Sequence, residues 1–462
     1  MNTELANTLL DATIVVLLVV VSVGCAIHAL MNKRDPRAAI GWIALCLLAP
    51  VFGPLSYWLL GVNRTSRHAE AQARTTKTAT LTHFELIGDG PVREPPPPTS
   101  GNNVQPMFDA EQSFSAMLQA IDEATQQIWM SQYIFEAAGV GDRFITALIN
   151  AAGRGVSVHV ILDRVGALYS WGSTRRRLQR GGVRVAMFLP PVFRPFAWRL
   201  NLRNHRKILV IDHALAFTGG MNIRNGYLAG QDGRPAQIYD THFACRGPVV
   251  EDLARVLWDD WQYASGEHIA QTPAHTTATG NTQCRVTIDG PDNHVDLLTV
   301  TIQAAIASAT SHVRIMMPYF LPPRELASGL QAAAIRGVAV DIVIPARNNL
   351  PFVHWAMMHM FKDLLRYGIR VHCQTGAFNH SKLITIDHDR CLFGSVNIDF
   401  RSLRLNFELA IEAWDRALTA ALIDHIDARI ATADLVTLDG VTTLPAWVRF
   451  RNALAWLASP YL

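Results

Sequence analysis

The sequence contains one short motif twice, and this duplication constrains the fold more than any other feature. The first copy reads NHRKILVIDHALAFTGGMNI over residues 204–223, and the second reads NHSKLITIDHDRCLFGSVNI over residues 379–398. Each copy has a His, a Lys two residues later, an Asp five residues after that, and then a small-residue turn that ends in Asn. The repeated positions are His205, Lys207, Asp212 and Asn222 in the first copy and His380, Lys382, Asp387 and Asn397 in the second. Two strings with the same spacing and the same continuation indicate an internal duplication.

The segments that precede the two motifs repeat as well. ALINAAGRGVSVHVIL at residues 147–162 resembles GLQAAAIRGVAVDIVI at residues 329–344, and both join a helical pattern to a strand-like run through a glycine turn. Helices that alternate with strands favour parallel strand pairing and an α/β fold. A chain of 462 residues is long enough for two such units. We predict one repeat at residues 106–265 and a second at residues 285–430.

The N-terminal region is strongly apolar. Residues 12–31 are almost unbroken apolar sequence, about the 20 residues that a helix needs to cross a bilayer. A cleaved signal peptide is the alternative, but the first basic residue, Lys33, follows the apolar run instead of preceding it. A second apolar run covers residues 38–61 and contains Pro50 and Pro54, which could kink a spanning helix or make it re-entrant. We predict a transmembrane hairpin over residues 1–61.

Two spans would leave the rest of the chain on the side of the membrane where it begins. Basic residues occur in the turn between the spans and again after the second span, whereas the tail before the first span has no Lys or Arg. The excess of basic residues in cytoplasmic loops then favours a cytoplasmic body. We therefore expect a multi-pass membrane protein.

Three other segments have a distinct composition. Residues 62–105 are polar and include a run of four prolines, which is typical of a stiff linker. Residues 193–206 interleave aromatic and basic side chains, which suits a lipid headgroup or a nucleic-acid backbone, or else a solvated loop with its aromatic residues in the core. Residues 440–462 are too short and too charged to span, and we predict an amphipathic tail on the membrane surface.

Charge and cysteine content narrow the choice of partner. The formal net charge of +3 does not demand nucleic acid as a partner, so an anionic ligand must be met by a local cluster. The six cysteines include no CxxC pair and no His partner at zinc-like spacing. Neither a disulfide framework nor a structural metal site is expected.

The spacing of the motif separates its residues into two groups. If ILVI and LITI are strands, residues two apart share a face, so each His and its Lys point the same way. Asp212 and Asp387 then point to the opposite face. We keep both Asp residues in the candidate catalytic set as motif members, but we expect them to act structurally, in the turn after each strand.

An imidazole beside an ammonium group suits an anion such as phosphate better than a metal cation. Two copies supply two His and two Lys around one phosphate, as phosphodiester exchange requires: one His attacks phosphorus and the other moves the proton of the alcohol. Asn222 and Asn397 are candidates to stabilise the phosphate oxygens, and Asp240 and Glu408 to orient the imidazole rings. No metal or cofactor is needed for this chemistry. The spacing does not choose which His is the nucleophile.

At these residues the chain resembles the phospholipase D superfamily, whose HxKxxxxD pattern occurs as HRKILVID and HSKLITID. The pieces RNHRK, GGMNI, DTHF, GPVV, PYFLP and GSVNIDFRSLRLNFE resemble the two-motif bacterial cardiolipin synthases, in their order. The resemblance implies two phospholipase D-like α/β/α sandwich domains packed about a pseudo-twofold axis, in an enzyme of the bacterial inner membrane. It also implies that two phosphatidylglycerol molecules are joined into cardiolipin with release of glycerol, His205 being the nucleophile and His380 the general acid and base. Ser381, where the family often has Ala, and RNNLP after Pro345 depart from its pattern.

Three other functions remain open at this point. A phospholipase D that passes the phosphatidyl group to water would use the same residues. A membrane-tethered nuclease would need a longer basic groove than this chain suggests. A silent lipid-binding scaffold would not need two intact His/Lys pairs.

Overall fold

The computed structural model describes residues 2–33, 36–61, 95–188, 202–230, 234–269, 277–290 and 296–459. The chain divides into two compact units, Met1–Thr75 and Thr76–Leu462. Most of the predicted linker and residues 193–201 of the aromatic and basic segment lie outside the described residues.

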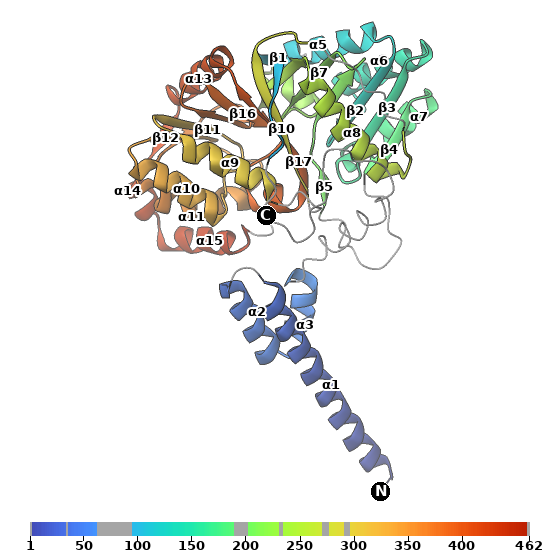
Figure 1. The fold of residues 1–462 in the computed structure, drawn as a ribbon. Coiled ribbons are helices and arrows are strands. Elements are labelled where there is room, and N and C mark those ends of the chain that lie inside the picture. The colour runs from blue at the N-terminus through green and yellow to red at the C-terminus, as the bar shows by residue number, and fades with distance from the viewer. Residues whose placement is uncertain are drawn as a thin grey trace. The chain divides into compact units, whose positions relative to one another are not determined.

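The first unit contains one long helix. Helix α1 (Asn2–Asn32) is followed by α2 (Pro36–Leu48), α3 (Phe52–Ser56) and the short helix η1 (Tyr57–Gly61). Within α1, Leu9–Asn32 is long and apolar enough to cross a membrane. Figure 1 shows α1 as one extended helix. The length and composition of α1 therefore suit a membrane anchor.

The second predicted span, residues 38–61, does not form one helix, so the prediction of two long spanning helices is wrong. Helix α2 ends at Leu48, and the chain turns at Pro50, which has no N–H to continue the hydrogen-bond ladder. Gly53 then lies so close to α2 that a Cβ at this position would be 2.1 Å from the Leu45 carbonyl oxygen. Among the described residues, α1 is the one helix that passes the test for a membrane span.

The second unit is built on one mixed sheet (Figure 1). The first half supplies β1 (Thr99–Met107), β2 (Gln127–Gln132), β3 (Ser157–Asp163), β4 (Arg184–Phe188), β6 (Ile208–Ile211), β7 (Leu215–Gly219) and β9 (His242–Arg246). The second half supplies β10 (Thr282–Asp289), β11 (His312–Met316), β12 (Ala339–Pro345), β13 (Arg370–Gln374), β15 (Leu383–Ile386), β16 (Arg390–Gly394), β17 (Asn406–Trp414) and the edge strand β18 (Asp434–Val436).

The strand order shows the duplication directly. It runs β13-β12-β11-β15-β16-β17-β10 in the second half and continues as β1-β9-β7-β6-β2-β3-β4 in the first, so each half mirrors the other. The central strands β1 and β10 are antiparallel. The expected parallel pairs are β2–β3–β4 and β11–β12–β13, and antiparallel strands complete each half.

Strand β1 corrects the predicted linker, which we extended to residue 105. Residues 99–107 lie at the centre of the sheet, between β9 and β10. The side chain of Asn102 is buried and donates to the Thr99 and Thr282 carbonyl oxygens, while its own oxygen accepts from the Val249 N–H. A polar sequence can occupy a central strand when its buried groups are bonded in this way.

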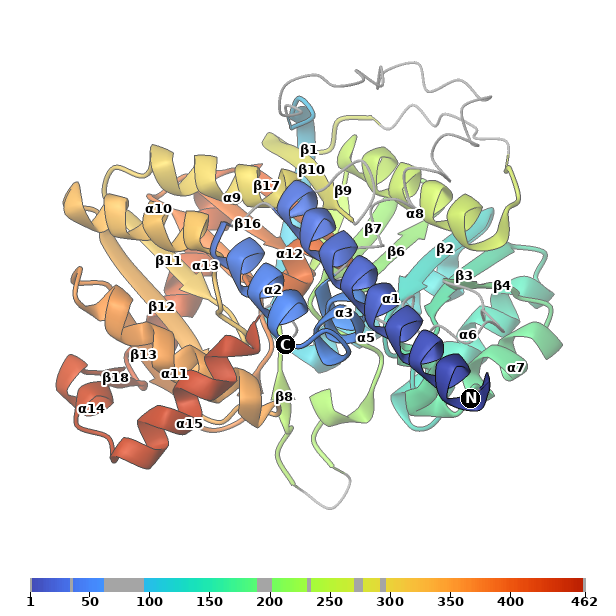
Figure 2. The same ribbon diagram turned by 90° about the horizontal axis from the view of Figure 1, so that it is seen from below.

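Helices cover both faces of the sheet (Figure 2). The larger ones are α5 (Ala110–Glu123), α6 (Val140–Gly153), α8 (Val249–Ser265), α9 (Leu297–Ser308), α10 (Arg324–Ile335), α11 (Pro351–Leu365) and α13 (Arg416–Ile430). The remaining elements are η2 (Gly166–Ser170), α7 (Ser173–Arg180), β5 (Arg203–Asn204), η4 (Asn225–Tyr227), β8 (Ile238–Tyr239), β14 (Phe378–Asn379), α12 (Phe400–Arg404), α14 (Leu438–Thr442) and α15 (Ala446–Leu457). One apolar core is shared by both halves, where Phe243 stacks on Phe393 with ring centroids 3.7 Å apart. This shared core fixes the two motifs relative to each other.

Candidate active site

The backbone of each half holds the motif histidine of the other half. Strand β5, which ends one residue before His205, pairs in parallel with the start of β17, and the His205 N–H donates to the Phe407 carbonyl at 2.9 Å. Strand β14 ends one residue before His380 and pairs with β8, and the His380 N–H donates to the Tyr239 carbonyl at 2.7 Å. These exchanged contacts bring the two motifs together.

The carboxylates are exchanged in the same way. Nδ1 of His205 lies 3.0 and 3.1 Å from the two carboxylate oxygens of Glu408, and Nδ1 of His380 lies 2.8 Å from Oδ2 of Asp240. Glu408 and Asp240 are buried. A ring that donates its Nδ1–H to a carboxylate keeps its lone pair on Nε2. The structure therefore pairs each His with an acid from the opposite half.

The two carboxylates differ in their surroundings. Glu408 also accepts from Ser395 Oγ at 2.5 Å and Asn406 Nδ2 at 3.1 Å. Burial alone would raise the pKa of Glu408, but the charges and hydrogen bonds around it, chiefly those of His205, hold it below its usual value. Burial raises the pKa of Asp240 to about 6, although Lys382 opposes this. Glu408 is thus the more firmly ionised of the two acids.

Both motif lysines are buried beside the histidines. Nζ of Lys207 donates to the His205 carbonyl at 2.6 Å, and Nζ of Lys382 donates to the His380 carbonyl and lies 3.0 Å from His380 Nδ1. Burial lowers the pKa of Lys207 to about 7 and that of Lys382 to about 8. An anion between them would favour the charged form of both lysines.

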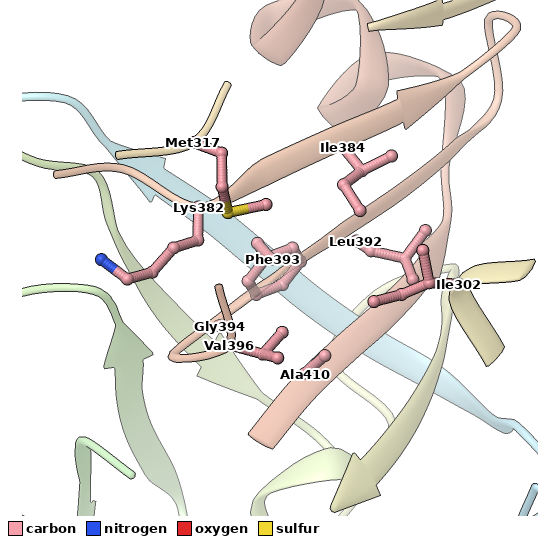
Figure 3. Close-up of a pocket in the computed structure, with 9 residues that line it drawn as sticks. All are labelled: Ile302, Met317, Lys382, Ile384, Leu392, Phe393, Gly394, Val396 and Ala410. Atoms are coloured by element: carbon pink, nitrogen blue, oxygen red, sulfur yellow. The ribbon is translucent and has the colours of Figure 1, made fainter. Parts of the chain in front are cut away.

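The stem of Lys382 lies in an apolar pocket (Figure 3). The pocket is lined by Ile302, Met317, Lys382, Ile384, Leu392, Phe393, Gly394, Val396 and Ala410. Figure 3 shows the ammonium group of Lys382 pointing away from these side chains. Packing around the methylene chain restricts the positions that Nζ can reach, which lowers the entropy lost when it binds an anion.

The pKa values of both histidines are lowered, which favours their neutral form. Burial lowers the pKa of His205, and the charges of the two motif lysines add to this effect, while Glu408 opposes it. The pKa of His380 lies well below its usual value because of burial and the nearby charges of Lys382 and Lys207. A neutral imidazole with its Nε2 lone pair exposed is the form that can attack phosphorus.

Asp212 and Asp387 lie away from this cluster, at the far end of their strands. The Asp212 carboxylate accepts from the backbone N–H groups of Thr125, Gln126 and Gln127, each at 2.8 Å. Asp387 accepts in the same way from Thr310, Ser311 and His312, at 2.7 to 2.9 Å. These contacts tie the end of one strand to the start of its neighbour, and the place of both Asp residues in the candidate catalytic set stays a prediction.

The two asparagines of the motifs also have structural contacts. Oδ1 of Asn222 accepts from the Ile134 N–H at 3.2 Å, and Nδ2 of Asn397 donates to Ser402 Oγ at 3.4 Å. Both side chains are buried. Their expected interaction with phosphate stays a prediction.

Three aromatic residues at the site were not predicted from the sequence. The ring of Tyr133 meets that of His205 edge-on with centroids 5.1 Å apart, and Tyr319 meets His380 at 6.3 Å. The hydroxyl of Tyr227 lies 3.4 Å from His380 Nδ1. Tyr133 and Tyr319 are the third residues of two similar runs, SQYIF and MPYFL. That repetition was the available clue to their shared position.

Arg206 requires a correction, because we placed it in a segment suited to lipid headgroups. Its side chain is 2% exposed, with Nη1 2.5 Å from Asp260 Oδ1. It also donates to the carbonyl oxygens of Glu408 and Asp289, each at 3.0 Å. Arg206 therefore holds the strand that carries Glu408 and does not face a lipid.

Two exchanged His–carboxylate pairs with two buried lysines, on a duplicated α/β sheet, define the class of phospholipase D-type transfer enzymes. A family model described as "Cardiolipin synthase, PLD-like domain" matches residues 117–261 and 302–430, and one described as "Phospholipase_D-nuclease N-terminal" matches residues 20–61. The chain belongs to the cardiolipin synthase family of the phospholipase D superfamily, which confirms the resemblance seen in its sequence.

Relatives of known activity match the chain over nearly its whole length. It is 28% identical over 458 residues to the major cardiolipin synthase ClsA of Bacillus subtilis (strain 168), covering 93% of this chain and 95% of that protein. It is 30% identical to cardiolipin synthase A of Yersinia pseudotuberculosis serotype O:1b (strain IP 31758), covering 95% and 96%. The chain is thus a phosphatidyltransferase of the phospholipase D type.

A solved structure supports the fold. The crystal structure of phosphatidylserine synthase from Haemophilus influenzae Rd KW20 superposes with a TM-score of 0.62 at 13% identity, covering 78% of this chain and 95% of that one. Within the described ranges, no group of three or more His, Cys, Asp or Glu side chains is arranged to hold a metal ion.

Proposed function

We propose that the chain transfers a phosphatidyl group from one phosphatidylglycerol molecule to a second, giving cardiolipin and glycerol. The observation that carries this proposal is the pair of histidines whose Nδ1 atoms are held by carboxylates of the opposite half, at 2.8 to 3.1 Å. The charge of each motif lysine also acts on the histidine of the other half, so the two His/Lys pairs lie within electrostatic reach of each other. A pseudo-twofold arrangement of the two repeats, 106–265 and 285–430, is supported by the mirrored strand order.

In the first step Nε2 of His205 attacks phosphorus, and the bond from phosphorus to the glycerol headgroup oxygen breaks. Nε2–H of protonated His380 gives its proton to the departing alkoxide, so free glycerol leaves. A phosphatidyl group remains on His205 through a P–N bond. Glu408 assists the attack by His205, because its negative charge favours the positive charge that develops on the His205 ring.

In the second step the headgroup hydroxyl of another phosphatidylglycerol attacks the same phosphorus. His380 takes the proton of that hydroxyl, the P–N bond breaks, and neutral His205 is restored. His380 must therefore be protonated in the first step although its pKa in the free protein is low. A bound phosphodiester brings negative charge beside Lys207 and Lys382, which raises the pKa of the nearby imidazole.

The test is product analysis with the full chain in detergent or vesicles that contain phosphatidylglycerol labelled in the headgroup glycerol. Cardiolipin with an equal amount of free glycerol supports transfer, whereas phosphatidic acid with glycerol would identify a hydrolase that uses the same residues. His205→Ala should abolish the covalent phosphatidyl adduct. An adduct that survives His205→Ala but is lost in His380→Ala would reverse the two roles.

We also propose that the chain is a protein of the bacterial inner membrane, with its catalytic body on the cytoplasmic side. Support comes from the apolar helix α1 and from the basic residues of the segment before the catalytic body, Arg64 and Arg67 among them. Residues 36–61 are proposed to enter the bilayer as a re-entrant segment or a broken second span. Accessibility of single cysteines placed in the turn after α1 and at the C-terminus, measured in intact cells, tests this topology: labelling of the C-terminal cysteine by an impermeant reagent would contradict it.

A further inference from the structure

We infer that two apolar lips beside the active site, together with one face of α15, form a surface that docks the catalytic unit onto an anionic lipid bilayer. The first lip is Leu168, Tyr169 and Trp171, and the second lip is Leu350 and Phe352. The α15 face is Trp447, Phe450, Leu454 and Leu457. This inference rests on the proposed function, since it explains how a headgroup reaches His205 while its acyl chains stay in the membrane.

The first lip is attached directly to the nucleophile. Asp163 Oδ1 accepts from the Val165 and Gly166 N–H groups at the start of η2, while its Oδ2 accepts from the N–H of Asn204, the residue before His205. Gly166 is packed so closely that a Cβ there would lie 1.6 Å from the Tyr133 carbonyl oxygen. One buried carboxylate thus fixes the root of the first lip to the motif.

The side chains of the first lip are nevertheless turned to solvent. Trp171 is 87% exposed, Leu168 is 64% exposed and Tyr169 is 57% exposed. Trp171 also adopts a left-handed backbone conformation, with φ of 49°. A bulky residue rarely takes that conformation, and such outliers gather where function requires them. Exposure of three large apolar side chains to water on one loop is unfavourable, and their burial in lipid would be favourable.

The second lip is attached to the other histidine. The hydroxyl of Tyr319, whose ring meets that of His380, donates to Asn349 Oδ1 at 2.8 Å, directly before Leu350. Leu350 is 48% exposed and Phe352 is 60% exposed. Burial is the main cause of the raised pKa of Tyr319, and Tyr169 of the first lip adds to it, so Tyr169 lies within electrostatic reach of the residue that anchors the second lip.

The α15 face extends the second lip. Helix α15 packs along α11, the helix that begins at the second lip (Figure 2). Between them, the Arg451 guanidinium lies 4.3 Å from the ring centroid of Trp355 on α11 and 5.5 Å from that of Trp447 on α15. The residues of the α15 face recur every three or four positions, so they share one side of the helix. This gives the amphipathic tail predicted from the sequence a defined position in the fold.

Charge identifies the partner as an anionic bilayer. From Arg164 to Arg180 the chain has five Arg and no Asp or Glu, and residues 346–362 and 443–462 also lack acidic residues. Arg175, Arg176 and Arg180 are exposed behind the first lip, and Arg449 is exposed on α15. Apolar and aromatic side chains flanked by basic ones match an interface of lipid headgroups over acyl chains.

The experiment separates bilayer substrate from dispersed substrate. The full chain is reconstituted in phosphatidylcholine vesicles and assayed with long-chain phosphatidylglycerol in the same bilayer, or with short-chain phosphatidylglycerol dissolved as monomers. Trp171→Asp and Phe450→Asp should each lower kcat/KM for the bilayer substrate by about tenfold or more, the factor that follows from loss of burial of one large apolar side chain. Activity on the short-chain substrate should stay unchanged.

Ile335→Asp is the matched control, because Ile335 is 72% exposed at the end of α10 and belongs to neither lip. It should leave both activities unchanged. A fall in both activities in the Trp171→Asp and Phe450→Asp variants, or no fall in either activity, would overturn the docking surface.

A second readout does not depend on turnover. Brominated lipids quench tryptophan fluorescence only at short range, so Trp171→Phe and Trp447→Phe should each remove part of the quenching seen in the native chain. If neither substitution changes the quenching, the docking surface is wrong even if the enzyme makes cardiolipin. If quenching behaves as expected but no cardiolipin forms from either substrate, the proposed function fails and the docking surface stands.

Discussion

Replacing Glu408 by Gln removes one charge from the site while keeping the shape of the side chain. The Glu408 carboxylate lies 3.0 and 3.1 Å from His205 Nδ1 and is fully buried, so water cannot replace it. A hydrogen bond to a charged group is worth about 1.5–3 kcal/mol net. Since about 1.36 kcal/mol corresponds to a tenfold change in rate, loss of the charge should lower kcat about 10- to 150-fold.

The effect should fall on formation of the adduct, because the positive charge develops on His205 in that step. Rapid-mixing measurement of headgroup glycerol release in the first turnover therefore checks the prediction. KM for phosphatidylglycerol should change little, since Glu408 contacts the His205 ring and not the lipid. The free energy of unfolding should fall by about 1–3 kcal/mol, because Ser395 and Asn406 keep a neutral acceptor in place of a charged one.

Glu412 provides a matched control on the same strand and the same face of the sheet. It is equally buried and accepts from Arg390 Nε at 2.6 Å, away from the motif histidines. Glu412→Gln should lower stability without changing the first turnover. The reasoning is refuted if folded Glu408→Gln releases glycerol as fast as the native enzyme, or if Glu412→Gln slows the release to the same extent.

Three further predictions concern charge and stability. Burial lowers the pKa of Lys207 to about 7 and of Lys382 to about 8, so kcat/KM should fall as pH rises through 7 to 8. The free energy of unfolding should instead rise between these values and the ordinary lysine pKa of 10.5, because the unfolded chain binds more protons in that window. Parallel pH series of activity and of denaturant unfolding check both signs. Asp212→Asn should lower the free energy of unfolding by about 1–3 kcal/mol through lost N–H acceptors and leave kcat unchanged, and a lost kcat at native stability would contradict a purely structural role for Asp212. Arg206→Met should destabilise the chain by about 3–5 kcal/mol, because the buried Asp260 carboxylate loses the positive charge beside it, and Arg206→Met with Asp260→Leu should recover most of that loss in denaturant unfolding; equal instability of both variants would contradict it.

Local patterns in the sequence predicted those parts of the site that depend on spacing within one strand. The two-residue period of ILVI and LITI placed each His with its Lys and turned Asp212 and Asp387 to the other end, where the structure has them. The parallel units of the sheet followed in the same way from helices alternating with strands. These features depend on neighbours a few residues apart, so one segment of sequence contains them.

Contacts between distant segments could not be predicted in the same way. The exchange that gives Glu408 to His205 depends on the register of β5 against β17, residues about 200 positions apart in the chain. Arg206 looked like a surface residue because its neighbours are basic and aromatic, while its partner Asp260 lies 54 residues away. Strand β1 was assigned to the linker because its polar sequence gives no alternation strong enough to reveal a buried central strand.

The exchanged contacts also bear on how a site of this kind can be assembled at all. A chain with one copy of the motif has a His whose carboxylate belongs to the other copy, so it could complete the site only as a symmetric dimer. The antiparallel junction of β1 and β10 and the mirrored strand order have the form of such an interface, with both subunits joined in one polypeptide. Fusion allows the two copies to differ in sequence. The residue after the His is Arg206 in the first half, where it binds Asp260. In the second half it is Ser381, whose hydroxyl lies 3.2 Å from the Thr241 hydroxyl. A symmetric dimer could not assign one histidine permanently to attack and the other to proton transfer, and a fused chain can.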